Sequence, residues 1–223
     1  MSDKIRDMFA EIAGKYDLLN DVLSFGMHRL WKKKLIKLSE PTKNSKVLDL
    51  ATGTGDIAFL YAMTSNDVTG IDLTPEMIEI AKKRSVSSNP QFFVGDALNI
   101  NFDNNTFDII SISFGIRNVD DIRQALREMH RVLNKNGKIV ILEFGQALPP
   151  FSYIYNFYSK HILPIIGRII SGSVFAYEYL PESSARFPAG DNFTDIVKEL
   201  KIFSNVKFHR LFYGIAYIYV INK

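Results

Sequence analysis

The chain has 223 residues, of which 47% are apolar and 23% are charged, a composition typical of one globular domain with a complete core. A formal net charge of +3 is too small to indicate a nucleic-acid partner. The chain contains no cysteine, which excludes disulfides, thiolate nucleophiles and cysteine-based metal sites and fits a reducing cytoplasm.

The N-terminal segment carries charges of both signs and lacks the apolar core of a signal peptide. No run of about eighteen uncharged apolar residues occurs, because Pro164 and Arg168 interrupt the closest approach at residues 162–170. We therefore expect a cytoplasmic protein, with contact at a membrane surface left open. The histidines are scattered without metal-ligand spacing, so no metal site is expected: His28, His130, His161 and His209.

Apolar residues at helical spacing predict an amphipathic helix that begins near Ile5 and ends near Gly14, followed by a short turn of helix and a second helix from His28 to Leu38. The basic side chains of that second helix are expected on a solvated face rather than on anionic lipid. They are Arg29, Lys32, Lys33, Lys34 and Lys37.

Short apolar runs alternate with helical segments after residue 46, which predicts a parallel sheet with helices on both faces. A tight connection at Gly214 then forces two final strands to pair antiparallel. The expected strands are residues 47–51, 67–73, 91–96, 107–114, 138–144, 206–213 and 215–222, and the expected helices are 57–63, 75–84, 121–133 and 192–203. The fold class is α/β: a doubly wound, mostly parallel seven-stranded sheet that ends in an antiparallel hairpin and resembles class I S-adenosylmethionine (SAM)-dependent methyltransferases.

The stretch KVLDLATGTGD at residues 46–56 predicts a strand that breaks at Gly53 and Gly55 and feeds a helix, leaving backbone N–H groups facing a nucleotide or nucleoside. The spacing also fits dinucleotide sites, so the turn alone does not separate NAD from other adenosine-bearing cofactors. Asp49 in the buried strand favours a cationic ligand such as SAM over a pyrophosphate. The alternative is that Asp49 only holds the loop.

Three further polar residues are expected at strand ends, where ligands of such sheets bind. Asp72 is expected to accept hydrogen bonds from ribose hydroxyls. The alternative is that Asp72 caps the following helix, which is disfavoured because Thr74 already fits the N-cap position. Asp96 is expected to hold the adenine amino group, or else to hold its own loop. Ser113 lines the same pocket or is a simple buried hydroxyl.

Seven stretches of the chain resemble the C-methyltransferases of menaquinone and ubiquinone biosynthesis, over nearly the whole length. The run at 113–119 and the stretch at 179–183 are the most specific. The stretches are YDLLND (16–21), MHRLWK (27–32), DLATGTGD (49–56), GID (70–72), SFGIRNV (113–119), LEF (142–144) and YLPES (179–183).

The resemblance implies that SAM is the cofactor and that a prenylated quinol is methylated on a ring carbon. The implied reaction converts demethylmenaquinol to menaquinol, with a 2-polyprenyl-6-methoxy-1,4-benzoquinol as the alternative acceptor. The residues implied to contact SAM are Thr54, Asp72, Asp96, Ala97 and Ser113. The chain departs from the family pattern at residues 134–137 and 184–186, which puts any role of Arg186 in doubt.

Carbon methylation of a quinol needs positioning, in-line approach and a route for one proton, without a metal or covalent nucleophile. Arg117 is expected to stabilise a phenolate or hold a water, unless it pairs with Asp120 or Asp121. Asn118 is expected to orient the quinol oxygen. The remaining two candidates are Asp56, as eventual proton acceptor, and Tyr16, which orients the ring or packs in the core.

The expected organisation is a single methyltransferase domain over residues 1–223, with an N-terminal helical cap (1–40), a SAM-binding core (46–144), a substrate-lid insertion (148–190) and a C-terminal helix and hairpin (192–223). The insertion is rich in Phe, Tyr and Ile, which predicts a groove for a polyprenyl tail and a transient membrane contact. A homodimer stays open. The competing hypotheses are a methyltransferase for RNA or a small soluble acceptor, which the apolar insertion disfavours, and a non-catalytic SAM-binding scaffold.

Overall fold

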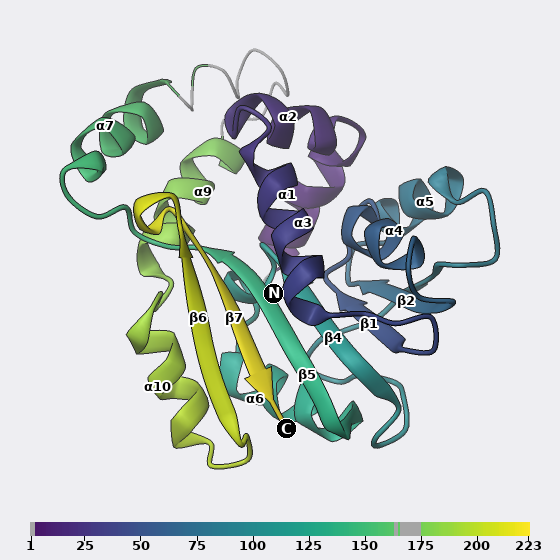
Figure 1. Ribbon diagram of the computed structural model, residues 1–223. Helices are drawn as coiled ribbons and strands as arrows, with labels where there is room; N and C mark the ends of the chain where they lie inside the picture. Colours follow the sequence, from purple (N-terminus) through teal and green to yellow (C-terminus); the bar gives the residue numbers. More distant parts are fainter. Residues whose placement is uncertain (1–2, 163–164, 166–174) are drawn as a thin grey trace.

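The computed structural model describes residues 3–162, 165 and 175–223, and its strands form one sheet in the order β3-β2-β1-β4-β5-β7-β6 (Figure 1). The strands are β1 (Lys46–Leu50), β2 (Asp67–Asp72), β3 (Gln91–Val94), β4 (Phe107–Ser113), β5 (Leu133–Phe144), β6 (Asn205–Leu211) and β7 (Ala216–Asn222). Strands β1 to β5 are parallel, and β7 pairs antiparallel with both β5 and β6. The predicted fold class is confirmed.

The helices lie on both faces of this sheet and at its upper end. They are α1 (Asp3–Ile12), α2 (Tyr16–Leu23), α3 (Met27–Ser39), α4 (Asp56–Ala62), α5 (Pro75–Arg84), α6 (Ile122–Val132), α7 (Phe151–Phe157), α9 (Phe175–Arg186) and α10 (Asp191–Glu199). A π-helical segment, Tyr158–Ile162, follows α7 directly.

Alternating side chains of the central strands explain why the sheet is buried on both faces. Leu48 and Leu50 pack in the core beneath α6 and α10, whereas Val47 packs in the core beneath α3, α4 and α5. Strand β5 repeats the pattern, with Ile141 on the first face and Leu142 on the second. Near-continuous apolar runs in the sequence therefore became strands with helices on both sides.

Local chemistry sets several element ends. Asp121 accepts a hydrogen bond from the backbone N–H of Gln124 at 2.9 Å and so caps α6. Helix α5 begins with Pro75 in its first turn, but the Thr74 side chain expected to cap it makes no such bond. The backbone N–H of Thr74 instead donates to Asp72 Oδ1 at 2.9 Å.

Two predicted boundaries differ from the structure by more than two residues. Strand β5 begins at Leu133 rather than at residue 138, because Leu133 pairs with Phe107 across a register shift in β4. Helix α10 ends at Glu199 rather than at residue 203, and Lys201 follows it in the left-handed region. The predicted hairpin forms through a 3-10 turn, Phe212–Gly214.

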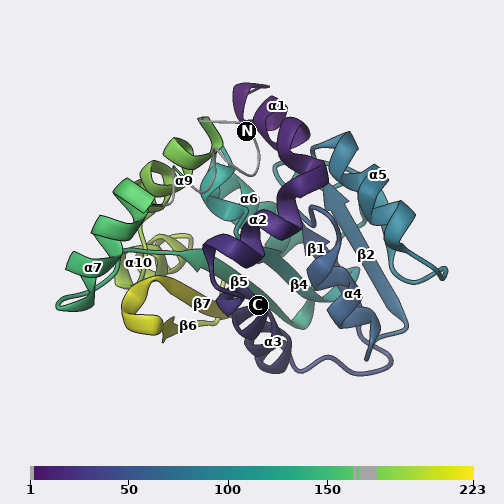
Figure 2. The ribbon, with the colours of Figure 1, turned by 90° about the horizontal axis from the view of Figure 1, so that it is seen from above.

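Helices α1 and α2 lie over the middle of the sheet, with α7 and α9 to one side and α5 to the other (Figure 2). The apolar faces of α1 and α2 meet in a small separate core of Met8, Ile12 and Leu19. Side chains of α9 and of the π-helical segment pack against this core. The cap and the insertion therefore form one cover. Residues 163–164 and 166–174 of the insertion, which the membrane hypothesis includes, lie outside the described residues.

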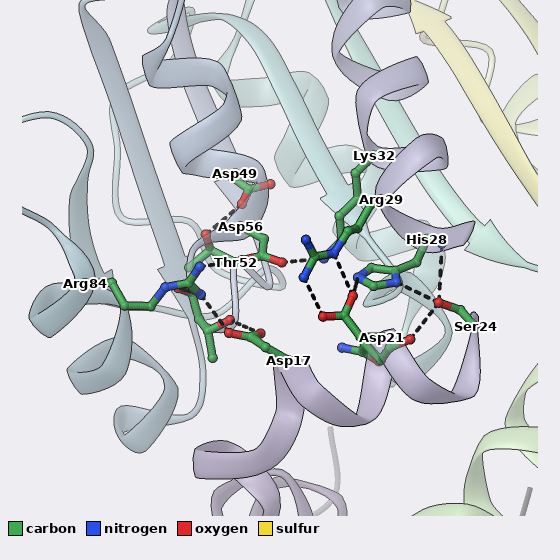
Figure 3. Close-up of polar contacts among 12 residues, drawn as sticks. Asp17, Asp21, Ser24, His28, Arg29, Lys32, Asp49, Thr52, Asp56 and Arg84 are labelled. Atoms are coloured by element: carbon green, nitrogen blue, oxygen red, sulfur yellow. Dashed lines mark hydrogen bonds and ion pairs between the residues drawn. The ribbon is translucent and has the colours of Figure 1, made fainter. Parts of the chain in front are cut away.

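A polar network ties the cap to the glycine loop and its helix (Figure 3). Arg84 of α5 donates to Asp17 at 2.9 Å and to Asp56 at 2.8 Å. Lys32 of α3 donates to Asp56 at 2.9 Å, and Thr54 Oγ1 donates to Asp17 at 2.7 Å. The prediction that α3 presents its basic residues on a solvated face is wrong for Lys32, which is 8% exposed.

No helix among the described residues has both the length and the apolar character needed to cross a bilayer.

We predict that Lys32→Met lowers the free energy of unfolding by about 3 kcal/mol, because it removes one partner of a buried ion pair and leaves Asp56 in the same place. Thermal and urea unfolding of the purified chain measure this change. The matched variant Lys33→Met, at an exposed position of the same helix, should stay within about 0.5 kcal/mol of the parent. Equal losses in the two variants would contradict the assignment.

Candidate active site

Two adjoining cavities lie where the parallel strands end. The first, called here the loop cavity, opens between the glycine loop, the ends of β2 to β4 and the cap. The second, called here the apolar cavity, opens between α1 to α3 and the insertion, with a volume of about 470 Å³, within the range of small-molecule sites. Phe9, Tyr16 and Phe114 line both cavities and therefore form the wall between them.

Five of the eight predicted cofactor residues line the loop cavity. They are Gly53, Asp72, Asp96, Ala97 and Ser113. Parallel strands bring them together because their carboxyl ends meet at one edge, next to the switch point between β1 and β4.

Asp72 lies at the base of the loop cavity and joins two of its walls. Its Oδ2 accepts from the backbone N–H of Gly53 at 2.8 Å, and its Oδ1 accepts from Thr74. Burial raises the pKa of this carboxyl, and the hydrogen bonds from Thr74 and Gly53 oppose the rise. The capping role weighed as the alternative is thus real, and it coexists with a position in the cavity wall.

Ser113 presents an unsatisfied hydroxyl in the wall of the loop cavity. Its Oγ is buried and has no hydrogen-bond partner among the described residues. A buried hydroxyl without a partner is costly. Because Ser113 lines the loop cavity, we predict that a ligand atom becomes the partner of this hydroxyl.

Asp49 lies behind the loop cavity rather than in its wall, which corrects the prediction that it faces a bound cation. Its oxygens accept from the hydroxyls of Thr52 at 2.6 Å and Ser111 at 2.7 Å. Burial raises the pKa of Asp49 to about 7. The alternative role of holding the loop is the one the structure supports, through two hydroxyls instead of backbone N–H groups.

Two more predicted cofactor residues, Thr54 and Gly55, also lie outside the wall of the loop cavity. Thr54 Oγ1 donates to Asp17 of the cap. Gly55 has a φ of +91°, and a Cβ there would lie 2.8 Å from Phe92, so glycine is required for the turn and the packing.

Asp56 is held in the ion-pair network and lines neither cavity. Burial raises its pKa, but Lys32 and Arg84 outweigh burial and hold the pKa below its ordinary value. A carboxylate bound to two cations is a weak base. We therefore assign Asp56 to fastening the cap and withdraw the prediction that it accepts the proton.

Arg117 lies in the wall of the apolar cavity, and its ion-pair partner is Glu143 rather than Asp120 or Asp121. Its Nη1 donates to Glu143 Oε1 at 2.6 Å and to the carbonyl of Phe114 at 2.6 Å. Burial raises the pKa of Glu143, and the Arg117 charge opposes the rise. The guanidinium is thereby fixed beside the wall that separates the cavities.

Asn118 lines the loop cavity at the same junction, and Tyr16 lines both cavities. Asn118 Oδ1 accepts from the hydroxyl of Tyr179 in α9 at 2.7 Å, which orients the amide. The Tyr16 ring is buried, and burial raises its pKa, so its hydroxyl stays protonated. The four residues predicted to be catalytic therefore separate into three at the junction and one, Asp56, in the network outside it.

The sequence analysis gave no role to Glu143, Ser111 or Tyr179, which hold Arg117, Asp49 and Asn118 in place. Glu143 carried a signal, since a carboxylate inside the apolar run of β5 requires a buried cation as partner. Among the described residues, no group of three or more His, Asp or Glu side chains is placed to bind a metal ion.

The loop cavity fits SAM on three observations. Asp72 and Asp96 place carboxylate oxygens at two neighbouring strand ends, where a ribose and an adenine amino group find acceptors. Ser113 supplies an unpaired hydroxyl. At Gly53, which has a φ of +55°, a Cβ would lie 3.9 Å from Tyr16 Cε1, so the bare backbone faces the cavity and the junction.

Solved structures show the same fold. A SAM-dependent methyltransferase from Thermotoga maritima superposes with a TM-score of 0.70 at 20% identity, covering 97% of this chain and 99% of that chain. Phosphoethanolamine N-methyltransferase 2 from Haemonchus contortus in complex with SAM gives a TM-score of 0.65 at 16% identity, covering 86% of this chain and 52% of that chain. The chain therefore has the class I SAM-dependent methyltransferase fold.

The chain belongs to the ubiE/COQ5 methyltransferase family, whose model matches residues 1–223. It is 47% identical over 220 residues to "Ubiquinone/menaquinone biosynthesis C-methyltransferase UbiE" of Bdellovibrio bacteriovorus, covering 96% of this chain and 94% of the relative. It is 43% identical over 230 residues to the protein of the same name from Rickettsia prowazekii, covering 98% of this chain and 92% of the relative.

We predict opposite effects for two serines of β4. Ser113→Ala should raise the free energy of unfolding of the SAM-free protein by about 1 kcal/mol, because it removes an unpaired buried hydroxyl. The same change should weaken SAM binding about fivefold, which corresponds to one lost hydrogen bond. Urea unfolding and titration calorimetry give the two quantities.

Ser111→Ala is the matched control for Ser113→Ala, since the Ser111 hydroxyl donates to Asp49 and not to the loop cavity. It should lower the free energy of unfolding by about 1–3 kcal/mol. An unchanged SAM affinity in Ser113→Ala would assign Ser113 to the core alone.

Proposed function

We propose that this enzyme transfers a methyl group from SAM to a ring carbon of a polyprenyl quinol and that its acceptor is demethylmenaquinol. One observation supports this proposal above the others: Phe9, Tyr16 and Phe114 separate a smaller cavity, with carboxylates in its wall for SAM, from a larger apolar cavity. A methyl donor bound in the loop cavity and an apolar acceptor bound in the apolar cavity would meet at this shared wall. The printed names of the relatives, which are quinone-biosynthesis C-methyltransferases, support the same reaction class.

SAM supplies an electrophilic methyl group, and the protein supplies position and charge. Arg117 holds a fixed positive charge where a quinol hydroxyl would lose its proton, which favours the phenolate. Asn118 presents an amide oriented by Tyr179, able to hold the quinol oxygen. Phe114 stacks on Phe144 at 4.3 Å between ring centroids and offers a flat aromatic surface next to the acceptor.

The menaquinone branch is favoured over the ubiquinone branch by the ATGTGD form of the loop at residues 51–56. That loop lies on the cofactor side, so the acceptor side must be tested directly.

A turnover assay with labelled SAM tests the proposal. The purified chain is given demethylmenaquinol or the methoxy-benzoquinol, each reduced and carrying the same prenyl tail. We expect kcat/KM to be higher for the naphthoquinol by about tenfold, a difference that pocket fit readily supplies. Transfer to the benzoquinol alone would favour the ubiquinone branch. Binding of SAM without turnover on either quinol would favour the non-catalytic scaffold.

We also propose that the mouth of the apolar cavity rests on the membrane that holds the quinol. Exposed aromatic and aliphatic side chains lie on α7, the π-helical segment and the turns at residues 24–26 and 212–214, and each of these segments also contributes residues that line the apolar cavity. Tyr153 is 76% exposed and Phe157 is 61% exposed, one turn apart on α7. Exposed apolar groups around a cavity mouth indicate an interaction surface, and a quinol with a prenyl tail is delivered from lipid.

The double variant Tyr153→Ser/Phe157→Ser should lose about tenfold in affinity for phospholipid vesicles in co-sedimentation, from the apolar area no longer buried. The double variant Met63→Ser/Val86→Ser is the control, since both residues are at least 82% exposed and belong to the segments that follow α4 and α5. Equal binding by the two double variants would contradict the membrane contact.

A further inference from the structure

His28 lies in the first turn of α3 and lines the apolar cavity, with 5% of its surface exposed. The sequence analysis placed it among scattered surface or core histidines. An imidazole both accepts and releases protons near neutral pH. Its burial in the wall of the proposed quinol site therefore suggests a role in proton transfer.

The hydrogen bonds around His28 fix its tautomer (Figure 3). Ser24 Oγ lies 2.6 Å from the carbonyl oxygen of Asn20, and only the serine hydroxyl can donate in that contact. The single hydroxyl proton of Ser24 is therefore used. The 2.7 Å contact between Ser24 Oγ and His28 Nδ1 must then be donated by His28. The proton sits on Nδ1, and Nε2 carries a free electron pair.

His28 is neutral at pH 7 in these surroundings. Burial lowers its pKa, the charge of Lys32 lowers it further, and Asp21 opposes both. The charged groups that act on His28 come from α2, α3 and α4, and they are Asp21, Arg29, Lys32 and Asp56. The other titratable groups that line the same cavity are Arg117, Tyr16, Tyr155, Tyr158 and Tyr179.

The other titratable groups in the wall of the apolar cavity are poor bases. Arg117 keeps its proton at any relevant pH. Burial raises the pKa of Tyr16, Tyr155 and Tyr158, so their hydroxyls stay protonated. Among the described residues that line this cavity, His28 is the side chain that combines a neutral state with a free electron pair.

We propose, on the basis of the proposed function, that His28 is the base that takes the quinol proton. The O–H bond of the quinol breaks, its electron pair stays on the oxygen as phenolate, and the proton forms a new bond to His28 Nε2. The ring carbon then bonds to the methyl group as the methyl–sulfur bond breaks and S-adenosylhomocysteine leaves. The ring carbon gives up its hydrogen as a proton, and one proton returns to the oxygen to restore the quinol, so the proton on His28 is the one released for each methyl group transferred. The resulting imidazolium then gives its proton to water.

Asp21 lies beside His28, is the more exposed of the two and can guide the release of that proton. Its Oδ1 lies 3.7 Å from His28 Nε2, too far for a hydrogen bond and close enough to stabilise a positive imidazolium. Its side chain is 30% exposed, whereas that of His28 is 6% exposed. Arg29 holds the Asp21 carboxylate through two hydrogen bonds, so the carboxylate stays ionised and in place. His28 lines the cavity and the Asp21 carboxylate beside its Nε2 is partly exposed, so the pair connects the cavity wall with solvent.

Steady-state methylation of reduced demethylmenaquinol, followed from pH 5.5 to 9, tests the proposal on the full chain. His28→Gln should lower kcat at least about a hundredfold, the usual contribution of a general base. It should also remove the acid limb of the kcat profile, while KM for the quinol and the calorimetric Kd of SAM change less than about twofold. Added imidazole should restore part of kcat in His28→Ala.

Asp21→Asn provides an independent readout at a partly exposed position. Removal of the Asp21 charge should move the acid limb to lower pH, because that charge raises the pKa of His28. Glu79→Gln, at an exposed position on α5, is the control and should leave the profile unchanged.

The outcomes separate the two proposals. A parent enzyme that binds SAM and methylates no quinol overturns the proposed function. A parent enzyme that methylates the quinol while His28→Gln keeps kcat and the acid limb overturns the role of His28 alone. If His28→Gln does not fold, the Asp21→Asn profile decides: a shifted limb supports the role, and an unmoved limb overturns it.

Discussion

The attachment of the N-terminal helices to the glycine loop is the interaction on which the rest of the site depends. Without α1 and α2, the loop cavity would be an open edge of the sheet, and the apolar cavity would lack one wall. Arg84 and Lys32 draw together acidic groups from α2 and α4 that would otherwise repel each other. The charged groups thus set the position of the cap over the glycine loop, and the apolar side chains of the cap contribute most of the surface that is buried there.

The residues at the carboxyl ends of the parallel strands were predictable from sequence because the pattern that places them lies in a few consecutive residues. A short apolar run ending in Asp72 or Asp96, each followed by a helical segment or turn, places an acidic group at the end of a parallel strand. The hairpin at Gly214 was predictable for the same reason, since the connection was too short for any crossover.

Asp49 was placed wrongly because the side-chain parity of its strand was not applied. Leu48 and Leu50 face the core beneath α6 and α10, so Asp49 must share the opposite face with Val47, under α3 and α4. On that face it meets hydroxyls and not the cavity. The side-chain contacts of Thr54 and Asp56 were not predictable for a different reason: their partners, Asp17, Lys32 and Arg84, lie 24 to 37 residues away in sequence, and only tertiary packing reveals them.

The distribution of charge supports the proposed location of the reaction at the junction of the cavities. Acidic side chains line the loop cavity, where a cationic methyl donor is stabilised, whereas the charge of Arg117 in the apolar cavity is compensated by Glu143. A phenolate formed in the apolar cavity would meet the donor cation across a wall of aromatic rings, in a medium that screens their attraction weakly. A neutral base preserves this balance because a carboxylate in the same wall would repel the phenolate. His28, held neutral by burial and by Lys32, is compatible with that requirement.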